Sequence, residues 1–372
     1  MKKIVLMFMI LVASGVQSEE FHECTSWMVF SDLTENGVNI LHKNRDNHAQ
    51  KVSAVMSSPN AKRKWVGLGN PNHNSPTMGL NESGLAVAVN SGEKTNYHSS
   101  NPKGKNTVRI CREILENCGT AEEAVKKLKS FIDAKDYNHR KSGSIFLFMD
   151  AKEGYICEIT AHYVATRKYD KGYICRANRW RFPEMDQFSN TPVNEVFGSS
   201  LRESIVKNSL KSVLRKGEKI DVEDIINIAR DSKLYAPAKT TSAVCGKKTL
   251  SALTMVIDKE FPDVLSYGYA LIGYPRHTIC VPLPICIDKL PTEMVDGSWS
   301  VGSYKNLAKQ GRFNKIPVEW IEFEKESRVK FEKTLAAARE LVRNNKKHEA
   351  IKLLNQTALE IWQGAEKFVF NK

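Results

Sequence analysis

The amino-acid sequence predicts an α+β protein built mainly on antiparallel sheets. Strand-like and helix-like runs alternate along the chain in blocks rather than one by one, which disfavours a doubly wound parallel sheet. The chain has 372 residues, of which 41% are hydrophobic and 26% charged, close to ordinary globular usage. This length is enough for one large domain with an appendage, and the composition excludes wholesale disorder.

The first block of the chain is strand-like. Residues 25–31 and 38–44 are largely apolar, and they flank the turn-rich segment 32–37. This pattern predicts an antiparallel hairpin. Residues 84–90 (GLAVAVN) form another short apolar run, which is typical of a buried strand.

Helical periodicity follows at 107–118 and 121–132. Thr120 is the expected N-cap of the second helix, and Glu123, three residues later, fits the partner position of a capping box. Strand and helix patterns then again come in blocks. We expect strands at 143–150, 154–160 and 163–169, helices at 199–214 and 222–230, and strands at 251–258 and 267–273.

The last part of the chain, residues 316–372, predicts an αα-hairpin attached to a main domain at 24–315. Asn344-Asn345 separates two helical stretches, each with apolar residues on one face. Packing of these faces against the main domain is favoured over a partner-binding role. The apolar stripe of the first stretch consists of Phe331, Leu335, Ala338 and Val342, and that of the second of Ile351, Leu354, Ala358, Ile361 and Ala365.

The N-terminus has the pattern of a secretory signal. Lys2 and Lys3 precede an unbroken apolar run at 4–12, and the small residue Ser18 marks the expected cleavage site. We therefore predict a signal peptide at 1–18 and an exported protein, either periplasmic or secreted. The run is too short to span a bilayer, and no later segment reaches about 20 apolar residues, so no membrane span is expected.

The formal net charge of +13 raises the question of a nucleic-acid partner. The lysines and arginines are scattered among acidic residues, and the sequence has neither zinc-finger spacing nor an aromatic-rich RNA-binding pattern. We expect a solvated basic surface and no nucleic-acid partner.

Eight cysteines in an exported chain would by default form disulfides, although their density is too low for a disulfide-stapled scaffold. No two of them have CxxC spacing, and the histidines show no ligand spacing, so no metal site is expected. If Cys24 is set aside, seven remain, and an odd number leaves at least one thiol outside any intrachain disulfide. The cysteines are at positions 24, 111, 118, 157, 175, 245, 280 and 286.

Cys24 lies just after the predicted signal and has three interpretations. A lipid anchor needs small and aliphatic residues before the cysteine, whereas Phe21, His22 and Glu23 are bulky or charged. A disulfide is the default structural interpretation. The third is catalytic: attack of the thiol on the Glu23 carbonyl would shed residues 19–23. The new α-amine, with a pKa of about 7.7–8, would then serve as the base for its own thiol.

Charged residues at the end of the second predicted strand support the catalytic interpretation. In an antiparallel hairpin the end of that strand returns to the start of the first one. Lys43, Arg45 and Asp46 are therefore expected beside Cys24. A carboxylate there could hold the α-amine, and a cation there could favour the thiolate or bind a substrate carboxylate. A charged hairpin end in solvent is the alternative.

Several motifs follow Cys24-Thr25 in order. An Asn-x-Asp ends the second strand at 44–46, and the next motifs are MGLNESGLAVAVN (78–90), CRANRWRFPEM (175–185), SSLRES (199–204) and TLSALTMVID (249–258). Together they resemble the linear-amide C–N hydrolases, which are N-terminal nucleophile hydrolases. These include the choloylglycine (bile salt) hydrolases, the penicillin V acylases and the acyl-coenzyme A:6-aminopenicillanic acid acyltransferase family. The resemblance implies a four-layer αββα sandwich.

The resemblance also implies roles for individual residues. Cys24 would be the nucleophile, and Asp46 would orient its α-amine. Asn90, with a backbone N–H, would stabilise the tetrahedral oxyanion, and Asn178 would fix the amine or the acyl oxygen. Arg202 would support the thiolate and the network around it.

Two departures from the family pattern concern the substrate. Bile salt hydrolases have Arg where this chain has Lys43, with Arg45 nearby, and the usual His after the second Asn is Arg179 here. Arg and Lys are not equivalent where a bidentate contact is needed. We therefore assign Lys43, Arg45 and Arg179 to substrate binding.

The sequence thus predicts an exported N-terminal-cysteine amidase that hydrolyses a linear amide through a thioester on Cys24 after autoproteolytic removal of a pro-peptide at 19–23. No metal or organic cofactor is expected. The partner would be a small-molecule amide: a conjugated bile acid, an N-acyl amino acid, a β-lactam side-chain amide or a dipeptide. The alternatives are an acyltransferase or dipeptidase of the same superfamily, and an exported binding protein with Cys24 in a disulfide. A homo-oligomer is left open.

Overall fold

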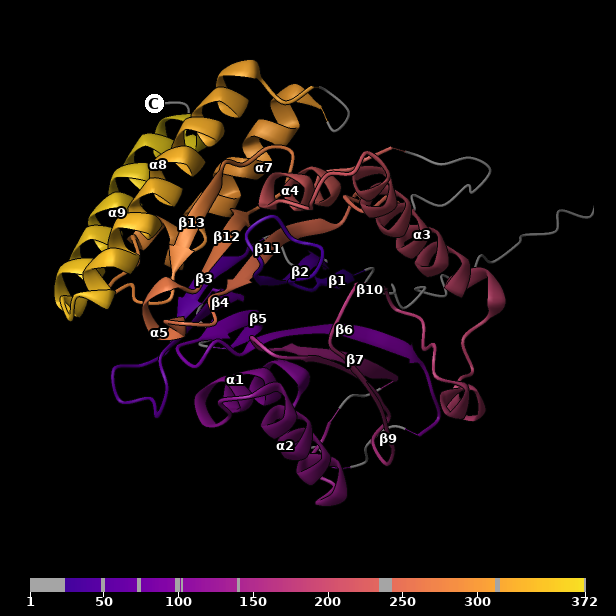
Figure 1. Cartoon of the computed structure of the whole chain (residues 1–372). Helices are drawn as coiled ribbons and strands as arrows, with labels where there is room; N and C mark the ends of the chain where they lie inside the picture. Colours follow the sequence, from indigo (N-terminus) through magenta and orange to yellow (C-terminus); the bar gives the residue numbers. More distant parts are fainter. Residues whose placement is uncertain are drawn as a thin grey trace, which may run out of the picture.

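The computed structural model describes residues 24–47, 51–71, 75–97, 101, 103–138, 141–233, 243–311 and 315–370. The predicted signal peptide (1–18) and pro-peptide (19–23) lie outside the described residues. The described chain forms two antiparallel sheets that face each other, with helices on both outer faces (Figure 1). This arrangement confirms the predicted α+β class and the four-layer αββα order.

The first sheet has six strands and brings together segments from the start, middle and later part of the chain. All neighbouring strands are antiparallel. The N-terminal hairpin lies inside this sheet, so its second strand is paired on both sides and all eight of its residues are buried. In order across the sheet the strands are β10 (Tyr173–Arg176), β1 (Thr25–Val29), β2 (Asn39–Asp46), β11 (Thr249–Ile257), β12 (Tyr267–Ile272) and β13 (Cys280–Pro284).

The second sheet is a seven-stranded meander, in which each strand pairs antiparallel with the next one along the chain. Its central strand, β6, packs across the gap between the sheets onto β1 and β2. The strands are β3 (Ser53–Met56), β4 (Trp65–Gly69), β5 (Pro76–Asn81), β6 (Ala86–Lys94), β7 (Ser142–Met149), β8 (Gly154–Ile159) and β9 (Val164–Tyr169).

Two groups of helices cover the outer faces. One group packs on the second sheet and the other on the first, on opposite sides of the molecule in Figure 1. The helices on the second sheet are α1 (Thr107–Asn117) and α2 (Ala121–Asp133). Those on the first sheet are α3 (Val193–Arg215), α4 (Val222–Ala229), α7 (Ser298–Gln310), α8 (Val318–Arg343) and α9 (Lys347–Phe370). The short helices are η1 (Pro183–Phe188), α5 (Pro262–Leu265) and α6 (Thr292–Val295).

The apolar core is divided by the second sheet. One cluster fills the space between the sheets and beneath the C-terminal helices, and the other lies between the second sheet and α1 and α2. In β6, Ala88 belongs to the first cluster, whereas Val87 and Val89 belong to the second. This is the alternation that a strand imposes, and it turns Asn90 of β6 toward the first sheet.

Most predicted elements occur close to the expected residues, including the hairpin at 25–44 and the helices at 107–132. The strands β3, β4, β5, β10 and β13 and the helix α7 were not predicted individually from the sequence. Two of these strands have only four residues, so they show too few alternations to be recognised. The strand β13 contains Pro282 and Pro284, which fit there because β13 is an edge strand of its sheet.

The N-terminus of α2 is capped nearly as predicted. The hydroxyl of Thr120 accepts a hydrogen bond from the backbone N–H of Glu123 at 3.1 Å. The carboxylate of Glu123 accepts from the backbone N–H of Gly119 at 2.6 Å, one residue before the position that a capping box requires.

The C-terminal hairpin forms as predicted and packs as an outer layer on the first sheet. Its turn places Asn345 in the left-handed region, with φ of 60°. The indole N–H of Trp362 in α9 donates to the carbonyl of Pro282 in β13 at 2.8 Å. Packing against the main domain, rather than a free partner-binding face, is therefore what the structure shows for the apolar stripe of α9.

A buried ion pair connects this layer to the main domain. Arg230, just after α4, donates from Nη1 and Nη2 to the two carboxylate oxygens of Glu324 in α8, at 2.7 and 2.6 Å. Its other donors bond the carbonyls of Pro275, at 2.8 Å, and Thr278, at 3.1 Å. Glu324 also accepts from the backbone N–H of Cys280 at 2.7 Å, so the pair is bidentate and enclosed in further hydrogen bonds.

Candidate active site

The register of the N-terminal hairpin determines which side chains surround Cys24. Strands β1 and β2 pair with Thr25 opposite Asn44 and Ser26 opposite Lys43. Because side chains alternate between the faces of a sheet, Ser26 and Lys43 point toward the second sheet while Thr25 and Asn44 point toward the helices. The same alternation puts Cys24 on the inner face, between the two sheets.

Cys24 lines a cavity of about 530 Å³ between the sheets. Lys43, Arg45, Asp46 and Asn90 line it as well, which confirms the proximity that the predicted hairpin implied. The cavity is therefore formed by the end of β2, the start of β1 and the end of β6.

Most of the described residues that line this cavity have polar side chains. Most of these lining residues could not be predicted from the sequence, because asparagines, serines and threonines at loop and strand ends resemble ordinary turn residues. The side chain of Asn106 could have been noticed, since it caps α1 by accepting from the N–H of Arg109. Besides the five predicted residues, the lining consists of Asn47, Asn70, Thr77, Val89, Ser91, Asn106, Thr107, Val108, Asn138 and Ser144.

The side-chain amide of Asn90 connects the two sheets through hydrogen bonds made by both its oxygen and its nitrogen. Its Oδ1 accepts from the Ser26 hydroxyl at 2.8 Å and from the Lys43 ammonium at 2.9 Å. Its Nδ2 donates to the carbonyls of Arg176 and Ala177, both at 3.0 Å. The amide therefore holds Lys43 in place. Its predicted oxyanion role stays a prediction, which requires one of the two Nδ2 bonds to be exchanged.

Lys43 is a buried cation next to the thiol. Its side chain is 1% exposed, and the ammonium donates to the carbonyl of Val89 and to Asn90. Among the described residues no carboxylate pairs with it. Burial lowers the pKa of Lys43, and the adjacent Cys24 thiol, within hydrogen-bonding reach, opposes this shift.

Arg45 is the second buried cation of the cavity, with 3% of the residue exposed. Its Nη2 donates to Oδ1 of Asn70 at 2.6 Å. Within the described part of the chain its Nη1 has no hydrogen-bond partner, and no carboxylate pairs with the guanidinium. Burial lowers the pKa of Arg45 below its ordinary value, and the nearby Cys24 thiol acts in the other direction.

Asp46 ends β2 and is 2% exposed. Its backbone carbonyl lies 3.9 Å from the Cys24 Sγ. On the neighbouring strand it is opposite Thr249, and its carboxylate faces Gly246, where an added Cβ would lie 3.5 Å from Oδ2. Burial, together with the charge of Asp46, raises the pKa of Tyr304 above its ordinary range. The carboxylate is thus at the same level of the sheet as the start of β1.

Asn178 and Arg202 are close to the nucleophile strand but do not line the cavity. Arg202, on α3, donates from Nε to the Thr25 hydroxyl at 3.1 Å and from Nη2 to Oδ1 of Asn178 at 2.7 Å. Asn178 in turn donates to the carbonyl of Ser91 at 2.9 Å. Both residues are 1% exposed. They position the residue after Cys24 from the helix side of the sheet.

Arg179 is not brought to the cavity. It is half-buried, and its Nη1 lies 3.4 Å from the Ser200 hydroxyl of α3. It follows Asn178 directly in the sequence, which is why the motif placed both at the site. Nothing in the observed contacts of Arg179 supports its predicted contact with substrate.

The other cysteines are buried thiols without disulfides. All eight cysteines lie in the described residues, and no disulfide forms among them, so the default expectation of disulfides is wrong for this structure. Burial raises the pKa of the thiols of Cys111, Cys157 and Cys280 to about 12. Such thiols carry little thiolate and are inert. Cys24 alone among the eight lines the cavity.

The described residues contain no group of three or more His, Cys, Asp or Glu side chains arranged to hold a metal ion. In the same part of the chain, no helix has both the length and the apolar character needed to cross a membrane. The groups that the candidate site does offer are a thiol, two cations and several side-chain amides.

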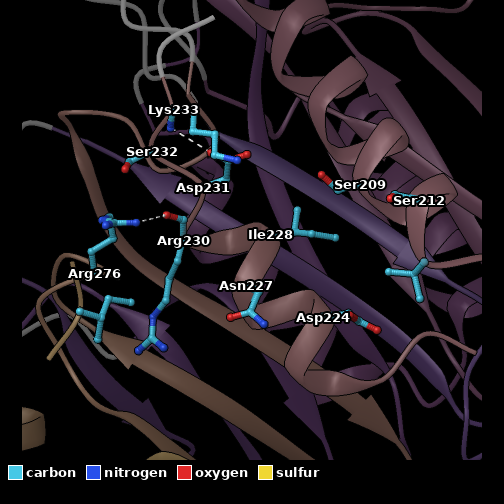
Figure 2. A pocket seen from close by; sticks show the side chains of 12 residues that line it. Ser209, Ser212, Asp224, Asn227, Ile228, Arg230, Asp231, Ser232, Lys233 and Arg276 are labelled. Carbon is cyan, nitrogen blue, oxygen red and sulfur yellow. Dashed lines mark hydrogen bonds between the residues drawn. The ribbon is translucent and has the colours of Figure 1, made fainter. Parts of the chain in front are cut away.

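A larger cavity, of about 800 Å³, lies beside α3 and α4 and is shown in Figure 2. None of its twelve lining residues is a cysteine. Arg230, labelled in Figure 2, is already held by Glu324, and its carbonyl accepts from Nη1 of Arg276 at 3.2 Å. Volume alone does not make this cavity a reaction site, and the smaller cavity at Cys24 is the candidate.

An αββα sandwich with a thiol immediately before its first strand, between the two sheets, defines the class of N-terminal nucleophile hydrolases. Within this class, the family model described as "Acyl-coenzyme A:6-aminopenicillanic acid acyl-transferase" matches residues 33–243, more than half of the chain. The chain belongs to this family. The match begins after Cys24, so the assignment of the nucleophile depends on the geometry of the site.

Several solved structures are similar at low identity. A variant of conjugated bile acid hydrolase from Clostridium perfringens is 13% identical, with 74% of this chain and 94% of that chain covered and a TM-score of 0.49. Penicillin V acylase from Agrobacterium tumefaciens is 14% identical, with 70% and 86% covered and a TM-score of 0.45. The Caenorhabditis elegans orthologue of N-acylethanolamine-hydrolyzing acid amidase is 16% identical, with 65% and 94% covered and a TM-score of 0.43. These likenesses are too distant to support further conclusions. A comparison with curated proteins found no match.

Proposed function

We propose that this protein is an exported amidase that hydrolyses a linear C–N amide bond through a thioester on Cys24. The observation that carries the proposal is the placement of the Cys24 thiol. It lies beside the buried Lys43 ammonium and lines a polar cavity, in a chain that belongs to an acyl-transferring family. Cysteine attacks carbonyl carbons once a base has removed its proton, and the free α-amine of a mature Cys24 would be such a base.

Maturation would come first. Attack of the Cys24 sulfur on the Glu23 carbonyl breaks the 23–24 peptide bond and transfers the acyl chain to sulfur. Water then hydrolyses this ester and releases the residues before Cys24. The product is a free α-amine on Cys24, with a pKa of about 7.7–8, which can accept the thiol proton at neutral pH. The carboxylate of Asp46, at the same end of the hairpin, would hold the protonated amine.

Turnover would repeat this chemistry on a bound amide. The thiolate attacks the amide carbon, and the tetrahedral oxyanion develops near Lys43 and Asn90, which line the cavity with Cys24. The α-ammonium of Cys24 gives its proton to the leaving amine, and the thioester remains. Water, deprotonated by the same amine, then attacks the thioester and restores the thiol.

Acyl transfer is the second candidate, favoured by the name of the matching family. The first half-reaction is the same, and an amine rather than water accepts the acyl group. Adding a free amine to the reaction and measuring the new amide against the free acid separates the two. A dipeptidase of the same superfamily remains a third possibility for the substrate. A binding protein with Cys24 in a disulfide loses its support, since Cys24 forms none.

Intact mass of the purified protein and a panel of N-acyl amides test the proposal. We expect the mature chain to begin at Cys24, and Cys24→Ala to retain residues 19–23 and to hydrolyse none of the amides. The matched control is Cys118→Ala, which changes a buried thiol that does not line the cavity. It should be processed and active. Hydrolysis by Cys24→Ala at the wild-type rate would refute the proposal.

A further inference from the structure

Arg45 has hydrogen-bonding capacity that the described chain does not use. A guanidinium has five N–H donors in a planar fork, and it is expensive to bury without acceptors. The side chain of Arg45 is 3% exposed, yet only Asn70 accepts from it, and Nη1 has no partner among the described residues. Because Arg45 lines the cavity, a molecule that enters it can approach the guanidinium, and a rotation of the side chain would bring the buried Nη1 donor to that molecule.

The charge of Arg45 is equally uncompensated. Asp46 is its neighbour in sequence, but consecutive side chains in a strand point to opposite faces, and no ion pair forms between them. Lys43, the other cation, uses its ammonium on Val89, Asn90 and the thiol. The two cations therefore differ in their contacts, and Arg45 is the one that has hydrogen-bond donors for a bound anion.

The position of Arg45 limits where that anion is in the substrate. Thr25 is opposite Asn44, so the next rung of the ladder brings Cys24 opposite Arg45. Side chains that face each other in this way have their Cβ atoms about 4.5–5.5 Å apart. An anion bound by Arg45 is therefore within about one residue's length of a bond attacked by Cys24.

We propose that Arg45 binds a carboxylate of the substrate, so that this enzyme acts on small amides with a carboxylate next to the scissile bond, such as N-acyl amino acids or dipeptides. This proposal rests on the proposed amidase function. A guanidinium fork matches a carboxylate through two parallel hydrogen bonds. The lining is consistent with the assignment, because most of the described residues around Arg45 have polar side chains, and Val89 and Val108 are the only aliphatic residues among them.

A pair of alkylating reagents tests the carboxylate site without requiring turnover. Iodoacetate and iodoacetamide react identically: the Cys24 sulfur bonds the methylene carbon, and iodide leaves with the electron pair. They differ in the carboxylate that only iodoacetate carries. An isolated thiolate repels that carboxylate and reacts faster with iodoacetamide. We expect the mature protein to react faster with iodoacetate, by about tenfold, and at a rate that saturates with reagent concentration.

Variants locate the effect. In Arg45→Met the iodoacetate rate should fall by about tenfold or more while the iodoacetamide rate changes little. Arg45→Lys should keep part of the preference, because the charge remains without the fork. Arg167→Met is the matched control, since Arg167 is exposed on β9 and pairs with Glu184. A wild-type protein that prefers iodoacetamide would overturn the proposal, even if Arg45→Met failed to fold.

Two substrate pairs then show on which side of the bond the carboxylate lies. An N-acetyl amino acid and its methyl ester put the charge on the amine side, and a succinic acid monoamide and its methyl ester put it on the acyl side. We expect kcat/KM to favour the acid by about 10- to 100-fold in one pair, and Arg45→Met to remove that difference. Equal hydrolysis of acid and ester in both pairs would overturn the carboxylate site and leave the amidase function standing. A protein that prefers iodoacetate but hydrolyses no amide would instead support the carboxylate site and refute the amidase function.

Discussion

Arg230 and Arg45 are buried to the same degree, at 5% and 3% exposure, but their surroundings differ. Arg230 is held by both oxygens of Glu324 and by two backbone carbonyls. Within the described residues Arg45 has one amide oxygen as its partner, from Asn70, and no carboxylate. Burial acts to lower the pKa of both arginines. For Arg230 the carboxylate outweighs burial and the pKa is raised, whereas for Arg45 it is lowered.

This difference separates structure from function in this protein. A buried charge with a complete set of partners stabilises one arrangement of the chain, here the packing of α8 against the main domain. Buried charges without carboxylate partners cost stability, and they persist where the cost serves a reaction or a ligand. Lys43 and Arg45 are of the second kind, and both line the cavity of Cys24.

The largest effect is expected for Lys43→Met, which removes the cation beside the thiol at nearly constant volume. We expect kcat/KM to fall by about 1000-fold, as for the loss of a main electrostatic group of an active site. The free energy of unfolding should not decrease, because a buried cation without a carboxylate is replaced by an apolar chain. Enzyme kinetics and urea unfolding measure the two quantities on the same preparation.

Lys43→Arg is the control for charge, because it keeps a cation at this position and should retain more activity than Lys43→Met. Wild-type activity in Lys43→Met would contradict this prediction. If the variant were also several kcal/mol less stable, Lys43 would have a structural role like that of Arg230.

Glu324→Gln should lower stability and leave activity unchanged, the opposite of what we expect for Lys43→Met. It leaves Arg230 buried without its carboxylate, and we expect the free energy of unfolding to fall by about 3–5 kcal/mol. Activity per folded molecule should be unchanged, since Glu324 does not line the cavity. The matched control is Glu360→Gln, which breaks an exposed pair with Lys330 and should cost nothing measurable. Equal losses in the two variants would remove the distinction between the two arginine sites.

A smaller effect is expected from His42, a buried neutral group with both nitrogens bonded. Its Nε2 is 2.8 Å from Asn44 Oδ1, and its Nδ1 is 2.8 Å from the Thr254 hydroxyl. The Asn44 amide nitrogen already donates to the carbonyls of Ala229 and Val244, so Oδ1 accepts from Nε2 and Nδ1 accepts from Thr254. Burial lowers the pKa of His42 to about 3.

The sign of the resulting pH dependence follows from proton binding. Below pH 6.5 the imidazole of His42 binds a proton in the unfolded chain, whereas in the folded protein it stays neutral down to about pH 3. The free energy of unfolding therefore falls as the pH drops from 6.5 to about 3. Urea unfolding of wild type and His42→Gln between pH 7 and 4.5 isolates this contribution. The wild type should lose up to about 1.4 kcal/mol per pH unit more than the variant. Parallel curves would mean that His42 titrates normally.

Local patterns in the sequence were sufficient to predict which strands form the site and several of the residues next to Cys24. Alternation and a turn-rich connection predicted the hairpin, and its geometry brought Lys43, Arg45 and Asp46 to Cys24, as the register and the cavity confirm. Motif order placed Asn90 on a strand that faces the first sheet. These inferences depended on neighbours along the chain or on one strand pairing, which sequence patterns encode directly.

The parts that were missed depend on contacts between distant segments. Asn70, Asn106 and Asn138 come to the cavity from three separate segments, and no local pattern marks such convergence. Arg179 shows the reverse error, because it follows Asn178 in the motif while its side chain contacts Ser200. Disulfides were expected by default for an exported chain, whereas all eight thiols are buried and free, because pairing depends on contacts between distant segments that the sequence does not encode locally.

Trapping of the acyl-enzyme tests the central claim most directly. Mature protein is mixed with a hydrolysed amide, quenched in acid within the first turnovers, digested and analysed by mass spectrometry. We expect an N-terminal peptide that begins at Cys24 and carries the mass of the acyl group on its sulfur, and no such mass on the Cys118 peptide. Turnover of the amide with the Cys24 peptide unmodified, or with residues 19–23 still attached, would contradict it.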